Sequence, residues 1–345
     1  MNVRDNQAHY KRIEAYLKEI LQEYMKVAQK SAEMVQGVPI DGMLQFKDYP
    51  HLNNQVERLF NEFSRNMDVI VRSGISNEWR EAHRVSDKLI ERYSRKTGIA
   101  PNLVKGYGER NLEALEAFTE RKYKGLGLSE RVWKYSSQFK GELELALSIG
   151  IGEGRSASEI SRDVRGYLRE PNRLYRKVRN EFGELVLSKN AKMYRSGQGV
   201  YRSSYKNAMR LARTEINRSY RTADYERRQQ LDFVVGIEVR RSNHDYDCPV
   251  CESLKGRYPK DFIFTGWHPN CRCHTVSILS TEAEFIEQQK AILEGREVPM
   301  KSKNEVTKIP LQMERWLKEN EERIENAKAK PLWMLENRNF VNNQS

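Results

Sequence analysis

Residues 248–273 read CPVCESLKGRYPKDFIFTGWHPNCRC, and this stretch contains all four cysteines of the 345-residue chain. The cysteines form two close pairs, one at each end of the stretch, and a histidine lies three residues before the second pair. Zinc takes four ligands in a tetrahedron, and thiolates and imidazoles are its usual ligands in proteins. Two close pairs that close one long loop therefore predict a metal site. The candidate ligands are Cys248, Cys251, His268, Cys271 and Cys273.

Other interpretations of the cysteines are reduced, buried structural thiols or a disulfide. Four clustered thiols in a reducing cytoplasm favour metal ligands over a disulfide. His274 directly follows Cys273 and begins an expected strand, so it is a weaker ligand candidate. A catalytic zinc needs an open coordination position and a nearby general base. The H-x-E pattern that precedes P-C-x-x-C in zinc deaminases is missing here. We therefore expect one structural zinc and no enzyme activity. The zinc ligands would be Cys248 and Cys251 with two or three of His268, Cys271 and Cys273.

Composition favours solvated helices and a polyanionic partner. The chain has 60 Lys and Arg against 48 Asp and Glu, a net charge of +12, with 31% charged and 38% hydrophobic residues. These values fit long helices better than one compact globule, and the basic excess favours contact with a polyanion. The opening residues have no apolar stretch typical of a secretory signal, and no run is long enough for a membrane helix. We expect synthesis in a cytoplasm and no membrane segment.

Apolar spacing predicts a mainly α fold, with long N-terminal helices, then a small α+β module closed by zinc, then a helical C-terminal tail. Two N-terminal capping boxes, at Ser156 with Glu159 and at Thr281 with Glu284, mark further helix starts. The expected regions are 1–129, 130–280 with the zinc module at 234–280, and 281–345. The expected helices are 8–36, 54–72, 76–95, 108–122, 132–147, a basic helix from 172, 202–230, 282–294 and 311–329, and the expected strands are 233–241 and 274–279.

Two basic runs, at 165–179 and 202–228, are interleaved with tyrosines. Such a surface would bind the DNA backbone without sequence specificity and with strong salt dependence. A solvated helix face balanced by acidic residues elsewhere is the alternative, and the same surface would also suit an acidic protein partner. The candidate contact residues are Arg165, Arg169, Arg173, Arg176, Lys206, Arg210 and Arg221.

Several segments resemble one known family. The sequences EGRSASEISRDVRGYL at 153–168, ARTEINRSYRTADY at 212–225, CPVCESLKG at 248–256 and HPNCRC at 268–273 are similar to the C-terminal domain of the phage Mu F-like head morphogenesis (minor capsid) proteins. The resemblance covers roughly residues 130–280. Its polar helix pair, Arg213 with Glu215, is expected to be a partly buried ion pair or cap that orients the metal-bearing loop.

The resemblance implies a virion protein, present in few copies inside the phage head near the portal. It implies a role in head morphogenesis and, in some members, in DNA delivery, so DNA packaging and ejection are further expectations. The implied partners are the portal protein, a scaffold or major capsid protein, and double-stranded DNA. The alternative function is a zinc-dependent nuclease or toxin-like effector enzyme. An added toxin domain is disfavoured, because no His or Cys follows residue 285.

Overall fold

A computed structural model describes residues 3–39, 44–98, 107–170, 177–187, 201, 203–242, 247–296, 302–327 and 329–341. The chain forms two compact units, each assembled from segments far apart in sequence. Unit 1 comprises Met1–Ile13, Gly74–Thr119 and Thr214–Ser345, and unit 2 comprises Glu14–Ser73 and Glu120–Arg213. These units cut across the three sequence ranges given above, because long helices supply residues to both units.

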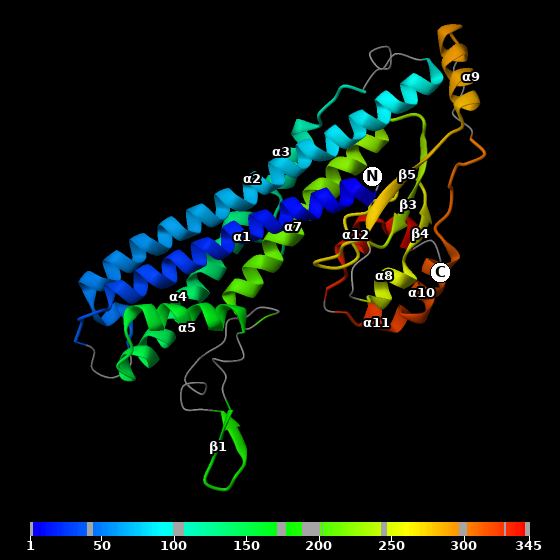
Figure 1. Ribbon diagram of the computed structural model, residues 1–345. Helices are drawn as coiled ribbons and strands as arrows, with labels where there is room; N and C mark the ends of the chain where they lie inside the picture. The colour runs from blue at the N-terminus through cyan, green and yellow to red at the C-terminus, as the bar shows by residue number, and fades with distance from the viewer. Residues whose placement is uncertain are drawn as a thin grey trace. The chain divides into compact units, whose positions relative to one another are not determined.

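Three long helices account for this arrangement (Figure 1). They are α1 (Val3–Met34), α2 (Pro50–Thr97) and α7 (Ser204–Gln229). The prediction of two helices at 54–72 and 76–95 is wrong, because α2 is one helix of 48 residues. Its buried residues Val71, Ile75 and Trp79 follow one another at a spacing of four, so the apolar face continues past Gly74 without a break.

Unit 2 packs α4 (Leu128–Gly152) and α5 (Ala157–Arg169) with its portions of α1 and α2. Its core includes an aromatic group in which the ring centroid of Phe139 lies 4.5 Å from Tyr24, 5.7 Å from Phe63 and 5.8 Å from Phe60. The capping box at Ser156 is confirmed, because its side chain accepts from the Glu159 amide and Glu159 bonds back. A short 3-10 turn, η1 (Phe46–Asp48), also belongs to this unit.

The basic helix expected from residue 172 is not present in the described part of that stretch. Strands β1 (Lys177–Arg179) and β2 (Leu185–Leu187) instead form an antiparallel hairpin. The side-chain oxygen of Asn180 accepts from the amides of Phe182 and Glu184, at 3.0 and 2.8 Å. Gly183 has φ 78°, a left-handed conformation that glycine adopts without strain. This turn chemistry outweighs the helical charge pattern.

Unit 1 contains a three-stranded antiparallel sheet in the order β4-β3-β5. The strands are β4 (Gly256–Tyr258), β3 (Val234–Arg240) and β5 (His274–Leu279). The last two confirm the expected strands, whereas β4 and the short helix α8 (Pro249–Ser253) were not expected. Helix α3 (Leu112–Glu120) matches the expected fourth helix, and α9 (Glu282–Leu293) begins at the expected capping box of Thr281.

The C-terminal helices are part of the cysteine module. They are α10 (Leu311–Glu319), α11 (Glu321–Glu325), α12 (Leu332–Glu336) and α13 (Arg338–Val341), where one helix at 311–329 was expected. Met313, Leu317 and Trp333 share one buried core with the four cysteines. Asn337 closes this contact, since its side chain accepts from the Ile263 amide and donates to the Ile263 carbonyl, both at 2.8 Å. Among the helices of the described ranges, none is both long and apolar enough to span a membrane.

Candidate metal centre

The two cysteine pairs are held by different local structures. Cys248 is the N-cap of α8, with Pro249 in its first turn, and Cys251 lies within that helix. Cys271 and Cys273 lie just before β5, after a turn in which Asn270 has φ 65° and the Cys271 amide donates to the His268 carbonyl. We call residues 268–273 the metal loop. Helix α8 and the metal loop thus bring their thiols close together.

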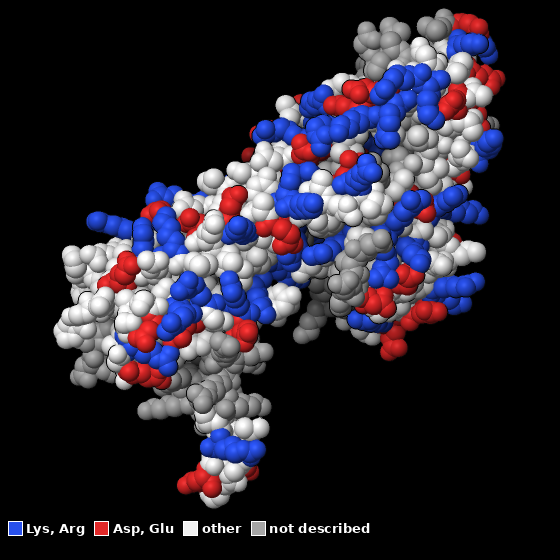
Figure 2. Space-filling model, in the orientation of Figure 1, with Lys and Arg blue, Asp and Glu red and all other residues white. Residues whose placement is uncertain are grey.

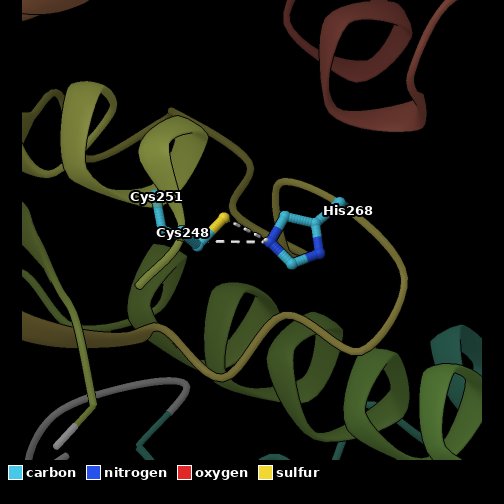
Figure 3. Close-up of side chains that lie close together, drawn as sticks. All are labelled: Cys248, Cys251 and His268. Carbon is cyan, nitrogen blue, oxygen red and sulfur yellow. Dashed lines mark hydrogen bonds between the residues drawn. The ribbon is translucent and has the colours of Figure 1, made fainter. Parts of the chain in front are cut away.

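His268 directs its Nε2 toward both thiols of the first pair (Figure 3). Its Nε2 lies 3.2 Å from the Cys248 Sγ and 3.1 Å from the Cys251 Sγ. The Cys251 Sγ lies 3.9 Å from the Cys271 Sγ. A tetrahedron with metal–sulfur bonds of about 2.3 Å has a sulfur–sulfur edge of about 3.8 Å. The spacing therefore fits a metal ion better than a disulfide.

The ligand atoms form two overlapping groups. Cys248, Cys251 and His268 have ligand atoms within 4.8 Å of one another, and so do Cys251, Cys271 and Cys273. Cys251 belongs to both groups, and all four cysteines are buried. The five side chains, which we call the Cys/His cluster, are consistent with a metal site. Hydrogen bonds among these thiols lower the pKa of Cys271 and raise that of Cys251.

The tautomer of His268 also suits a metal ligand. Its Nδ1 lies 2.8 Å from the carbonyl oxygen of Pro269, which can only accept. Nδ1 therefore carries the proton and donates, and the lone pair of the neutral ring is left on Nε2, the atom that faces the thiols.

An apolar shell surrounds the cluster. Trp267, Phe262 and Phe264 are buried in the same core as the cysteines. Trp267 also makes an edge contact with Trp333 of α12, at a centroid distance of 5.2 Å. Gly266 has φ 109°, and an added Cβ would lie 3.3 Å from the Cβ of Cys271. This shell keeps water from the thiols and fixes the path of the chain into the metal loop.

His274 lies outside the cluster. It is buried in β5, and burial, with the nearby positive charge of Arg221, lowers its pKa to about 4. Among the described residues, the ring nitrogens of His274 belong to neither group of candidate ligand atoms.

Nearby carboxylates are engaged in ion pairs. Arg241 Nη1 donates to Asp247 at 3.0 Å and to Glu252 at 2.8 Å, and Lys255 also contacts Glu252. The hydrogen bonds from Lys255 and Arg241 lower the pKa of Glu252. A depressed pKa weakens a carboxylate as a general base, so this pairing gives no support to a hydrolytic centre.

Carbonyl groups of the metal loop are held by residues that the sequence analysis missed. The Cys271 carbonyl accepts from the Asn217 side chain at 3.2 Å and from the Tyr10 hydroxyl at 3.0 Å. The Cys273 carbonyl accepts from Arg221 Nη2 at 2.9 Å. The guanidinium of Arg272 lies over the Tyr10 ring, 5.6 Å from its centroid. No local sequence signal links α1 to the metal loop, because Tyr10 lies more than 200 positions from Cys271 and Arg272.

The expected role of Arg213 and Glu215 is not what the structure shows. Arg213 donates to Glu14 at 2.9 Å, and Glu215 is buried with its carboxylate 3.9 Å from Arg218. The residues of α7 that orient the metal loop lie further along the helix, at Asn217 and Arg221.

The candidate DNA-contact residues fall into different environments. Arg165 and Arg169 are exposed on α5, and Lys206 and Arg210 are half-buried on α7. Arg173 and Arg176 lie outside the described residues. The assignment of Arg221 to a contact surface is wrong, because its side chain is 0% exposed. Its place on the inner side of α7, against the metal loop, explains the burial.

The visible face of the molecule carries both signs of charge (Figure 2). Basic side chains gather over the last part of α2, where exposed cations recur every four residues. These are Arg80, Arg84, Lys88, Arg92 and Lys96. Arg84 pairs with Glu81 and Lys96 with Glu282, so acidic residues offset part of this row. The row was not predicted from the sequence, because acidic residues lie between its basic residues along the chain.

The chain matches no family model, no curated protein and no solved structure in the three comparisons made.

Proposed function

We propose that the Cys/His cluster binds one zinc ion in a structural role. Five donors are available for four positions, and Cys251 is common to both ligand groups. His268 is supported as a ligand by its orientation and tautomer, together with Cys248 and Cys251. Cys271 or Cys273 would complete the tetrahedron. When bound, zinc would tie α8 to the metal loop and so close the module around its buried core.

We infer that the protein is a phage minor head protein that acts in head morphogenesis at the portal vertex. The observation that carries this proposal is that three of the four segments of the family resemblance meet in one site. Asn217 and Arg221 of segment 212–225 bond to Cys271 and Cys273 of HPNCRC, and Cys251 of CPVC contacts His268. Short sequences that meet in one site are a stronger argument than any one of them alone.

The portal assignment predicts a complex that survives nuclease treatment. When the protein and the portal protein of its phage are produced together and treated with nuclease, we expect them to purify together. We also expect the protein in mature particles, detected by mass spectrometry of purified heads. Absence from mature particles would contradict the virion location, and separation from the portal would contradict the partner.

Double-stranded DNA is a further proposed partner, through the exposed Arg165 and Arg169 of α5. Each phosphate contact contributes about 0.9 to the slope of log affinity against log salt. The variant with both residues replaced by Gln should therefore bind with a slope smaller by about 1.8. Replacement of the exposed Lys11 and Lys18 by Gln removes the same charge from α1 and serves as the control. Equal slopes for the two double variants would exclude α5 as the contact surface.

A further inference from the structure

The metal loop is connected to the start of α1 by a set of buried hydrogen bonds. Tyr10 donates to the Cys271 carbonyl at 3.0 Å. Arg221 Nη2 donates to the Cys273 carbonyl at 2.9 Å and lies 3.3 Å from the Asn6 side-chain oxygen. The first turns of α1 thus contact the metal loop directly through Tyr10 and indirectly through Arg221.

A second path runs from the metal loop through α7 and α1 to α2. The Cys271 carbonyl only accepts, so Asn217 presents its amide nitrogen to it and its oxygen to His9 Nε2, at 2.9 Å. His9 Nδ1 lies 2.5 Å from Glu78, and Arg12 holds the same carboxylate at 2.5 and 2.8 Å. Burial alone would raise the pKa of Glu78, but the hydrogen bonds from Arg12 and His9 outweigh it and lower the pKa. The path is therefore anchored on an ionised carboxylate.

Four of these side chains are buried. His9, Glu78 and Arg221 are each 0% exposed, and Asn217 is buried as well. Buried polar groups are costly unless their partners remain in place. Displacing the metal loop would remove the carbonyl groups that accept from Asn217 and Arg221, so the loop and the start of α1 stabilise each other.

The charge of Arg221 complements that of a metal–thiolate centre. Three or four thiolates outweigh the two positive charges of zinc, so the loaded centre carries net negative charge. Arg221 places a fully buried positive charge against the loop that bears two of those thiolates. A buried charge is strongly destabilising when its counter-charge is removed.

We propose that the N-terminal segment 3–13 is a working part of the metal centre, so that metal binding and docking of this segment stabilise each other. Tyr10, Asn217 and Arg221 are the positioning residues, and His9 with Glu78 fixes Asn217. This inference rests on the metal proposed for the Cys/His cluster. Because coupling is reciprocal, weakening the contacts of α1 lowers the affinity for zinc, and removing the metal loosens the segment.

The first test measures the rate at which the full-length protein loses zinc to an excess of chelator. Tyr10→Phe removes only the hydroxyl that bonds to the Cys271 carbonyl, and we expect release to be about 10-fold faster, as for other groups that support metal ligands. Tyr93→Phe is the matched control, because Tyr93 is a buried tyrosine of unit 1 whose hydroxyl bonds to Ser280 instead. Its release rate should equal that of the unaltered protein. Equal rates for the two variants would overturn the inference.

The second test measures amide hydrogen exchange in the full chain with zinc bound and after chelation. We expect amides of residues 3–13 to exchange at least about 10-fold faster without metal, while those of α4 in unit 2 stay unchanged. Unchanged protection of residues 3–13 after metal removal would contradict the coupling. A protein that holds no zinc as purified would instead contradict the metal proposal itself, so the two failures are distinguishable.

Discussion

Cys251→Ser is expected to abolish zinc binding and to destabilise unit 1 by ~4 kcal/mol or more, the range reached when a structural metal is lost. Cys251 is the residue common to both ligand groups, so its loss leaves Cys248 with His268 and Cys271 with Cys273 as two pairs that no shared ligand joins. Serine keeps the size of the side chain but is a poor zinc ligand. Elemental analysis should find about one zinc per chain before the substitution and none after it.

Two histidine substitutions, one in the cluster and one far from it in sequence, provide a further comparison. His268→Ala should lower zinc content or affinity, because Nε2 of His268 faces both thiols of the first pair. His51→Ala changes an exposed histidine of α2 in unit 2 and should leave zinc content unchanged. No zinc in the unaltered protein and unchanged thermal stability in Cys251→Ser would show that the cysteines are structural thiols rather than ligands.

Phe139→Ala is expected to reduce the free energy of unfolding of unit 2 by about 3–5 kcal/mol, the usual cost of removing a fully buried aromatic ring. Phe139 is 0% exposed and packs against Tyr24, Phe60 and Phe63. The three neighbouring rings lie on two helices, Tyr24 on α1 and Phe60 and Phe63 on α2, and cannot all move in to fill the cavity. Denaturant unfolding followed by circular dichroism measures the change.

Trp133→Ala is the matched control for this substitution. Trp133 lies on the same helix, but its side chain is 61% exposed, so its removal should change stability by less than about 0.5 kcal/mol. Similar losses for the two variants would contradict the placement of Phe139 as the centre of the unit 2 core.

Much of the local structure could be predicted from the sequence. The capping boxes at Ser156 and Thr281 begin helices as expected, because a side-chain oxygen and a glutamate three residues later satisfy the free amides of the first turn. The strands β3 and β5 follow from their β-branched residues. The Cys/His cluster was also predictable, since the spacing of Cys248 and Cys251 alone places two thiols on one short turn. These features depend on interactions between residues close in sequence.

Local sequence patterns did not predict the length of α2 or the hairpin at 177–187. Gly74 weakens a helix when taken alone, but burial of Val71, Ile75 and Trp79 along one face outweighs that preference. In the hairpin, the turn formed by Asn180 and Gly183 outweighs a charge pattern that suggested a helix.

Tertiary structure alone decided which residues support the metal centre and which face solvent. The basic run on α7 suggested Arg221 as a DNA contact, yet Arg221 is buried against the metal loop and bonds to the Cys273 carbonyl. Tyr10 and Trp333, near opposite ends of the chain, reach the same module through its hydrogen bonds and its core. Sequence spacing predicted the members of the Cys/His cluster because each close pair of cysteines is held by short-range geometry. The supporting residues depended on long-range packing, which brings α1, α7 and the C-terminal helices of unit 1 together only in the folded chain.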